Sequence, residues 1–554
     1  MRRAGLSFVV ALLVVTQAYA QVPALPSAAD PGAIQQRQME EERRRQEAER
    51  EQRKPVTEPL RRDIPEVPAA QPAPPALRFL VREIRFTKSE ILSAEELESV
   101  ARDFQGRELS LVDLQQLTAR VNELYRSKGV VTALAVLPPQ DVSGGVVQIR
   151  LVEGRLGATH VEGNDSTNAA YVVNRLGLKP DDLMDLGRLE SALVRFNRTH
   201  DAQLRAELKP GERFATTDLR VLMTEPPRHD LRLTLDTLGS SATGRERLGL
   251  SYINRSLLGF RDDLSLSVTR ASGQDSRSMT YGFPVNTWGG RLNLGYYEDS
   301  TAIKNGPLAS LNITGESVAH VLSVRQPTLV NSTAQIDIVA GGKQRKSSNW
   351  IDGVFLQRTD TTDHSLGVEA QLFDQQSSWF ASYIRSVGHS RVIEREGFRI
   401  DRGALRHNRN LGNGLSFRGN LWWQSSPKVL LPSSEQFFIG GEGSVRGYPV
   451  GVFSGDTGQA LNLELHHPLM QASANTSGVG ATGFFFMDYG RVKPFRPSDS
   501  SLDDHEALTG VGWGLHATVG KSVYARLTFG YGHTKVPLQP RSYEVTLQLV
   551  ASAF

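Results

Sequence analysis

The sequence contains no cysteine and carries little net charge, and both facts restrict what the protein can be. Without a Cys among its 554 residues, neither a disulfide framework nor a thiolate metal site can form. The formal net charge is only +3, which gives no electrostatic reason to expect a nucleic-acid partner. No stretch of eighteen apolar residues follows the N-terminal segment, so no transmembrane helix is expected.

The chain also lacks the patterns that indicate catalysis. It has no phosphate-binding glycine loop, so we expect no ATP-driven step. Its Asp, Glu and His residues form no convincing constellation, and the neighbouring His466 and His467 would point to opposite faces of a strand. We therefore expect no enzyme, no cofactor and no metal site.

The first twenty residues are typical of a secretory signal peptide. Arg2 and Arg3 form its basic region, residues 6–15 form its apolar core, and Ala18-Tyr19-Ala20 is a small-x-small cleavage site. Residue 21 is Gln rather than Cys, which excludes a lipoprotein anchor. Export without a membrane helix leaves secretion, the periplasm or a bacterial outer membrane.

Two segments of unusual composition follow the predicted signal peptide. We predict a charged helix over residues 33–54, because residues 35–54 are almost wholly Glu, Arg and Gln with opposite charges at helical spacing. It has no apolar face, so it suits solvent or a polar lumen, and twenty residues would reach roughly 30 Å, about one bilayer core. A nucleic-acid-binding arm is disfavoured because the Glu residues cancel the charge. Residues 55–76 are rich in proline and predict an extended linker.

Over residues 77–227 we predict two α+β units with a similar order of helices and strands, residues 77–154 and 155–227. A single larger α+β domain is the alternative, but the repeated β-α-α-β-β order favours two units. In the first unit, Ser93 and Glu96 predict a capping box at a helix start. The predicted elements of the first unit are strand 79–86, helices from 93 and over 111–127, and strands 130–137 and 146–152. Those of the second unit are strand 157–162, helices 168–176 and 186–199, and strands 202–208 and 218–224.

From residue 228 onward, apolar and polar residues alternate. Leu461, Leu463 and Leu465, for example, alternate with polar residues, which makes a sheet with one apolar face. Sixteen strands fit into residues 228–554, at the length expected of membrane-spanning strands. We predict an all-β outer-membrane barrel of about 16 antiparallel strands with a water-filled lumen. A large soluble sandwich would not need so many charged residues opposite an apolar face.

The strand count places a glycine-rich stretch in a long loop. Our eleventh strand, near residues 414–425, runs away from the two units, so the following connection of about 426–458 lies at the far, extracellular end of the barrel. This loop contains Arg446, and Asp488 lies near the outer part of the thirteenth strand on the lumen face. Because a guanidinium and a carboxylate can join through two parallel hydrogen bonds, we predict that the loop folds inward and pairs Arg446 with Asp488. A solvated surface turn is the alternative.

With these features, the chain resembles the two-partner-secretion outer-membrane transporters, which export filamentous haemagglutinins, adhesins and haemolysins. The loop motif of the family is present as Val445-Arg446-Gly447-Tyr448, and its strand motif as Phe486-Met487-Asp488-Tyr489-Gly490. The V-E-G-R join between its two polypeptide-transport-associated (POTRA) domains is Val152-Glu153-Gly154-Arg155. Each motif is weak alone, and the three together in this order are specific.

The resemblance implies a location, a mechanism and partners. The barrel would lie in the outer membrane with the POTRA domains in the periplasm, and the charged helix would plug the pore at rest. The expected partners are a large secreted protein bound through its N-terminal secretion domain, outer-membrane lipid, and the barrel-assembly machinery during biogenesis. We expect a monomer and no nucleic acid. The alternatives are a barrel-assembly factor of the wider superfamily, which would usually carry more periplasmic domains, and a porin, which would lack the POTRA pair.

The C-terminus departs from the family pattern. Phe554 is the expected assembly signal, but the apolar residues Tyr543, Val545, Leu547 and Leu549 stand in the register opposite to it. A β-bulge would bring the two registers together.

Overall fold

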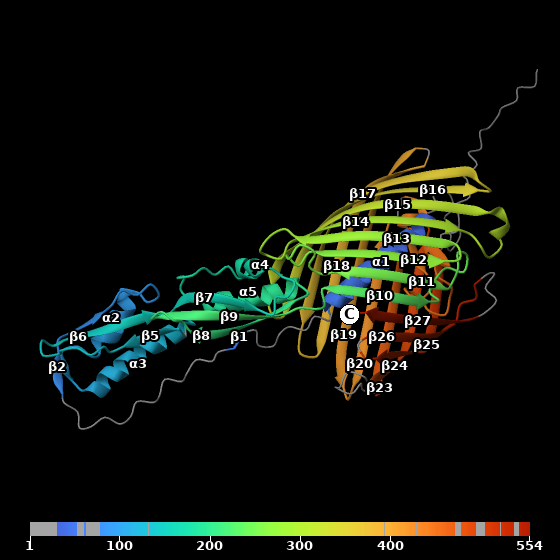
Figure 1. Cartoon of the computed structure of the whole chain (residues 1–554). Helices are drawn as coiled ribbons and strands as arrows, with labels where there is room; N and C mark the ends of the chain where they lie inside the picture. Colours follow the sequence, from blue (N-terminus) through green and yellow to red (C-terminus); the bar gives the residue numbers. More distant parts are fainter. Residues whose placement is uncertain are drawn as a thin grey trace, which may run out of the picture.

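The computed structural model describes residues 30–51, 60–61, 78–130, 132–392, 394–426, 429–470, 478–494, 505–520, 522–536 and 542–553. The predicted signal peptide, most of the predicted linker and Phe554 lie outside these residues. Two α+β units form an arm that meets one end of a large β-barrel (Figure 1).

The first α+β unit has a small three-stranded sheet of order β3-β6-β5 and a separate β2-β4 pair. The predicted strand over 79–86 is wrong as one element, because the chain changes partner at Arg82. The N–H groups of Arg82 and Glu83 both bond to the carbonyl of Gly145, which ends one pairing and begins the next. Its elements are β2 (Phe79–Val81), β3 (Glu83–Phe86), α2 (Ala94–Arg102), β4 (Arg107–Leu109), α3 (Leu111–Ser127), β5 (Ala133–Val136) and β6 (Val146–Glu153).

The start of each helix in this unit is fixed by a capping box. The predicted box is confirmed: the Ser93 side chain accepts from the backbone of Glu96, and the Glu96 side chain accepts from the backbone of Ser93. A second box joins Ser110 and Asp113 at the start of α3. Such boxes satisfy backbone donors that the first helical turn leaves without partners.

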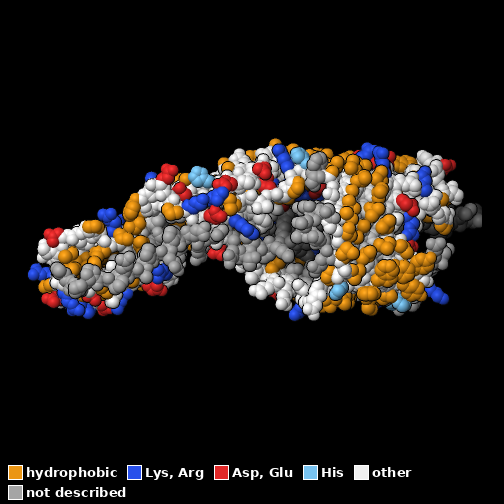
Figure 2. All heavy atoms as spheres, turned by 60° about the horizontal axis from the view of Figure 1, so that its bottom comes forward, with side chains coloured by type: hydrophobic (Ala, Val, Ile, Leu, Met, Phe, Trp, Pro, Cys, Tyr) orange, Lys and Arg blue, Asp and Glu red, His pale blue; other side chains and the backbone are white. Residues whose placement is uncertain are grey.

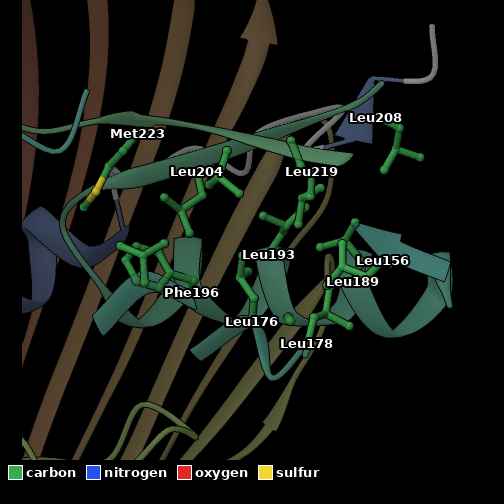
Figure 3. Close-up of a cluster of buried hydrophobic side chains, with 14 of the residues drawn as sticks. Leu156, Leu176, Leu178, Leu189, Leu193, Phe196, Leu204, Leu208, Leu219 and Met223 are labelled. Carbon is green, nitrogen blue, oxygen red and sulfur yellow. The ribbon is translucent and has the colours of Figure 1, made fainter. Parts of the chain in front are cut away.

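The second unit packs two helices against a sheet of order β1-β8-β9-β7. Leucines of α5, such as Leu189 and Leu193, meet Leu204 and Leu219 of the sheet in a closed core (Figure 3). Part of the predicted linker is a strand here, since β1 pairs in parallel with β8 and Leu60 packs on the core. The elements are β1 (Leu60–Arg61), β7 (Arg155–Glu162), α4 (Ala169–Leu176), α5 (Leu186–Thr199), β8 (Gln203–Pro210) and β9 (Thr216–Thr224).

The remaining strands close into an antiparallel barrel of sixteen, which confirms the predicted fold class. Each strand pairs with its neighbours in the chain, and β27 pairs with β10 to close the ring. The strands are β10 (His229–Asp236), β11 (Arg247–Asn254), β12 (Asp263–Ala271), β13 (Gln274–Pro284), β14 (Arg291–Ala302), β15 (Ile313–Val330), β16 (Ala334–Ile351), β17 (Val354–Phe373), β18 (Ser377–Arg391), β19 (Arg395–Gly412), β20 (Leu415–Ser425), β23 (Thr457–Met470), β24 (Val479–Lys493), β25 (Glu506–Val519), β26 (Val523–Gly532) and β27 (Tyr543–Ala553). A short 3₁₀ helix, η1 (Ala309–Leu311), lies between β14 and β15.

Alternation places apolar side chains on the outside of the barrel. Large residues such as Leu250, Leu366 and Phe485 are exposed there. Figure 2 shows hydrophobic side chains in rows on the face of the barrel that it presents. The bulge predicted in the last strand is wrong for the described residues, because β27 pairs with β26 and with β10 without a register shift. The side chains of Tyr543, Val545, Leu547 and Leu549 therefore point outward, and those of the even-numbered residues of β27 face the lumen.

Buried ionic contacts fix the second unit to the barrel. Arg261, in the turn between β11 and β12, is almost fully buried, and its Nε lies 2.9 Å from Oδ1 of Asp201 in the second unit. The same guanidinium donates to the Ser166 hydroxyl at 3.2 Å. Arg198 of α5 donates to the carbonyl of Ser332 in another turn of the barrel. Because a buried charge needs a partner in place, these contacts hold the arm at the barrel mouth.

Candidate functional site: a loop and a helix inside the barrel

A long connection of the barrel folds back into the lumen. Residues 426–456, described except for 427 and 428, join β20 to β23 at the end away from the arm. They contain η2 (Ser433–Glu435), β21 (Phe437–Ile439) and β22 (Phe453–Gly455), and the two strands pair as a small hairpin. Loops of this length that are packed rather than free usually carry function.

The structure brings Arg446 of this loop and Asp488 of β24 together. Nε of Arg446 donates to Oδ2 of Asp488 at 2.7 Å, and one terminal nitrogen donates to Oδ1 at 2.7 Å. The backbone N–H of Arg446 adds a third bond to Oδ2 at 3.0 Å. Asp488 is fully buried and Arg446 is 4% exposed. Two parallel bonds fix the orientation of the guanidinium, so the loop tip has one geometry.

Three further side chains surround the arginine. Its other terminal nitrogen lies 2.5 Å from Oε1 of Glu464, and its guanidinium carbon lies 3.7 Å from the ring centre of Phe486. Asn462 donates to Oδ1 of Asp488 at 2.7 Å and also to the carbonyl of Ser444. Burial alone would lower the pKa of Arg446, but the hydrogen bonds with Asp488 raise that pKa above its ordinary value. The arginine therefore stays charged although it is buried.

The motif 445–448 lies on a strip of lumen-facing glycines from β24, β25 and β26. The close approaches pair Gly490 with Val445, Gly510 with Arg446, Gly530 with Gly447, and Gly532 with Tyr448. A Cβ added at Gly510 would lie 2.0 Å from the carbonyl oxygen of Arg446. Glycines in strands often mark a place where another backbone approaches closely, and here they let the loop lie directly on the wall.

The other motif residues each have a structural role. Gly447 has φ +94°, and a Cβ there would lie 2.7 Å from the backbone of Tyr531, so a larger residue fits neither the conformation nor the space. The Tyr448 hydroxyl donates to the carbonyl of Thr509 at 2.9 Å. Val445 and Tyr448 pack in a small apolar cluster with Ile439, Val492 and Leu508.

The charged helix α1 (Pro31–Glu51) runs through the lumen (Figure 1). Its Gln38 amide donates to the Ser276 hydroxyl of β13 at 2.9 Å, and Arg406 of β19 donates to its Glu47 at 2.9 Å. Its Arg44 donates to the carbonyl of Gly443 in the loop at 2.7 Å. No helix in the described part of the chain is long and apolar enough to cross a membrane. The predicted helix end at residue 54 lies outside the described residues.

One arginine connects the helix, the loop and the wall. Arg345 of β16 is almost fully buried, and it donates to Oε1 of Gln35 at 2.9 Å and to Oε1 of Gln36 at 2.8 Å. The same guanidinium lies 3.1 Å from Oε1 of Glu435 in the loop. Burial alone would raise the pKa of Glu435, but this arginine and the neighbouring Lys343 and Arg402 hold it below its ordinary value.

Sequence reasoning placed Arg446 and Asp488 but missed their partners. Asn462 and Glu464 stand on the lumen face of β23, and the alternation of Leu461, Leu463 and Leu465 already assigns them to that face. The sequence does not give the register of β23 against β24, which places Asn462 directly opposite Asp488. Arg345 and the glycine strip gave no comparable signal in the sequence. Among the described residues, no group of three or more His, Cys, Asp or Glu side chains could hold a metal ion.

Comparisons with known proteins agree with this architecture. A POTRA domain model of the ShlB type matches residues 79–154. The outer membrane transporter CdiB of Dickeya dadantii is 26% identical over 412 residues, 70% of this chain and 72% of that protein. The heme/hemopexin transporter protein HuxB of Haemophilus influenzae is 24% identical over 468 residues, 76% of this chain and 77% of that protein.

Solved structures show the same fold. CdiB from Escherichia coli matches with a TM-score of 0.66 at 22% identity, over 94% of this chain and 98% of that one. BamA from Haemophilus ducreyi, without its POTRA domains 1–3, matches with a TM-score of 0.51 at 13% identity, over 86% of this chain and 100% of that one. The model of the haemolysin secretion/activation protein family ShlB/FhaC/HecB matches residues 216–517, more than half of the chain. The chain therefore belongs to this family and is an outer-membrane transporter of two-partner secretion, with its POTRA domains in the periplasm.

Proposed function

We propose that this transporter binds the N-terminal secretion domain of a large adhesin, haemagglutinin or haemolysin in its POTRA domains and passes the unfolded chain through the lumen without ATP. The second POTRA domain is docked at the barrel mouth through Arg261 and Asp201, so a partner bound there already lies at the entrance. Exposed sheet edges can add a strand of an unfolded partner, with affinity from backbone bonds and selectivity from side-chain pockets. The chain works without a cofactor and is not an enzyme in this proposal.

The Arg446–Asp488 pair is the element that holds the loop in its working position. The observation that carries this step is that three hydrogen bonds from one arginine converge on a fully buried carboxylate. Replacing one partner of such a pair leaves the other charge buried and unpaired, which typically costs about 3–5 kcal/mol. Val445, Gly447, Tyr448, Phe486 and Gly490 shape the seat of this pair.

Helix α1 is the resting plug in this proposal. Its contacts to the wall are hydrogen bonds and ion pairs, such as those of Gln38 and Glu47, and water can replace them when the helix leaves. Its surface is polar on all sides, so it has no reason to remain in lipid after release.

The rival function, insertion of other barrels, is less well supported. A barrel-assembly factor would have to open its wall toward the membrane. Here β10 and β27 are paired from Leu231 opposite Ala553 to Asp236 opposite Gln548, which closes the wall. We further propose a monomer, since the closed sheet has no edge strand left for a second copy. Phe554 serves as the signal to the assembly machinery in this proposal.

The test uses purified transporter in lipid vesicles, an unfolded fragment carrying the N-terminal secretion domain of the partner, and no nucleotide. Protease-protected partner is measured for the parent, for Arg446→Ala, and for Arg270→Ala, which removes an exposed arginine from the outer wall. The parent and Arg270→Ala should transport equally, and Arg446→Ala should transport at least tenfold less. If Arg446→Ala transports the partner as fast as the parent does, the proposed role of the pair is refuted. If the parent transports only when ATP is added, the claim that transport needs no ATP is refuted.

A further inference from the structure

Four cationic side chains gather on the outside of the barrel wall near its extracellular end. Lys346 of β16, Arg358 of β17, Arg391 of β18 and Arg395 of β19 line a hollow of about 360 Å³. We call these four residues the basic cluster. The hollow is also lined by His389, whose Nδ1 lies 3.0 Å from a terminal nitrogen of Arg395.

The basic cluster lies on the extracellular side of the exposed apolar residues of the outer wall. On β17, the exposed apolar residues Leu372, Val368 and Leu366 lead from the periplasmic end toward Arg358 on the same face. At about 3.3 Å per residue, the six steps from Leu372 to Leu366 cover roughly 20 Å along the strand. The eight further steps to Arg358 place its side chain beyond the roughly 25 Å of an outer-membrane apolar band, even for a tilted strand. The side chains of the cluster therefore point sideways at the level of the lipid headgroups.

The cluster has more positive charge than its neighbours neutralise. Asp360 is bound by Arg358 at 2.9 Å and by Arg391 at 3.1 Å, so one carboxylate already serves two arginines. Opposite Asp360 in the register stands Lys346, and opposite Arg391 stands Arg395. Asp360 therefore serves Lys346 as well. Arg391 meanwhile faces a second cation, Arg395, across β18 and β19, which is unfavourable unless an anion lies between them.

A similar pair of arginines elsewhere on the wall lacks this excess. On β12 and β13, Asp275 is bound by Arg270 at 2.7 Å and by Arg277 at 3.0 Å, with the same geometry as at Asp360. There, however, the residue opposite Arg277 on β14 is Glu298. Two cations meet two carboxylates, so that place has no need of a further anion.

We propose that the basic cluster binds the phosphate groups of a glycolipid in the outer leaflet of the outer membrane. Guanidinium groups bind phosphate oxygens through paired hydrogen bonds, and the hollow between the strands presents three of them together with an ammonium. A lipid is favoured over an acidic protein because the cluster faces sideways above the apolar band. Acyl chains of the same molecule can lie on the exposed Leu366 and Val387 below.

The test compares two matched double variants of the full transporter in detergent. Arg358→Ala/Arg391→Ala removes half of the cluster, and Arg270→Ala/Arg277→Ala removes two outward arginines that share one aspartate in the same way. The probes are a bisphosphorylated, acylated glucosamine disaccharide, the same lipid after enzymatic dephosphorylation, inorganic pyrophosphate and a polyglutamate peptide. Native mass spectrometry measures lipid binding, and the heat-dependent gel shift shows that each barrel is folded.

The phosphorylated lipid should bind the parent and the control variant equally, and should bind the cluster variant at least tenfold less. Equal loss in both variants, or equal binding of the dephosphorylated lipid, would overturn the proposal. Displacement of the lipid by pyrophosphate at equal concentration would assign the site to free phosphate instead. Displacement by polyglutamate would assign it to an acidic protein and would also overturn the proposal, while leaving the transport function untouched.

Discussion

Replacing Gly510 by alanine should release the tip of the in-folded loop without touching any charged residue. Gly510 lies in β25, and an added Cβ would lie 2.0 Å from the carbonyl oxygen of Arg446. The obstacle is a backbone atom, so no side-chain rotation relieves it. Gly510 lies within a regular strand, so alanine itself is not strained there.

The size of the effect follows from the geometry of the arginine pair. Relieving the overlap requires the loop to move by at least about 1 Å, since carbon and oxygen atoms do not approach closer than roughly 3 Å. That movement stretches the 2.7 Å bonds between Arg446 and Asp488 toward about 3.7 Å, beyond hydrogen-bonding distance. Breaking a buried pair costs about 3–5 kcal/mol, which lowers the population of the in-folded loop by a hundredfold or more.

The absence of native cysteine gives a clean assay. Ser444 is buried beside the pair, so maleimide labelling of Ser444→Cys reports exposure of the loop tip without background. Labelling should accelerate strongly in the Gly510→Ala background, and export of the partner should fall at least tenfold. The control is Gly443→Ala in the same loop, where the nearest atom to an added Cβ lies 3.8 Å away. Parental labelling and export in Gly510→Ala would show that the close contact on the glycine strip does not hold the loop.

The remaining predictions concern the plug and the periplasmic arm. Deleting residues 31–51 should raise single-channel conductance in planar bilayers while largely preserving export, and unchanged conductance would exclude α1 as the resting plug. The fragment 77–225 should bind the N-terminal secretion segment of the cognate partner by calorimetry and a scrambled peptide poorly; equal binding would move recognition to the lumen. Burial lowers the pKa of His200 to about 3, against about 6.5 in the unfolded chain. Because only the unfolded state gains this proton between those values, the stability of the second POTRA domain should be highest above pH 6.5. It should fall by up to about 1.4 kcal/mol per unit of acidification. Thermal melting should show this loss between pH 7 and pH 5 in the parent, and His200→Gln should show less of it.

Local periodicity is the reason why the barrel could be predicted from the sequence. Alternation with a period of two assigns each residue to a face without knowledge of any distant residue, so the sixteen strands and the inward side chain of Asp488 were both accessible. The same reasoning gave the direction of the eleventh strand and hence the side on which the Arg446 loop emerges. Capping boxes such as Ser93 with Glu96 are local in the same sense.

Features that depend on a second segment were not accessible. In the sequence, Gly510 is only a residue that disfavours a strand, and its role is apparent only once the loop is known to lie on it. Glu464 reads as one of many lumen-facing charges until Arg446 is placed beside it. The strand over 79–86 looked continuous in the sequence. Its residue pattern does not reveal that the strand pairing changes at Arg82, whose N–H bonds to the carbonyl of Gly145. In each case the deciding contact lies at least 18 residues away in the sequence.

The shared arginine Arg345 suggests an order of events during transport. It holds helix α1 through neutral amide oxygens of Gln35 and Gln36, whereas it holds the loop through the charged Glu435, which also has Lys343. The contact with Glu435 adds the attraction between opposite charges, which the bonds to the two amide oxygens lack. The loop is also joined to the wall at both of its ends, through β20 and β23. We therefore infer that the helix leaves the lumen first and the loop stays anchored, with the charge of Arg345 still neutralised by Glu435 when the exported chain enters.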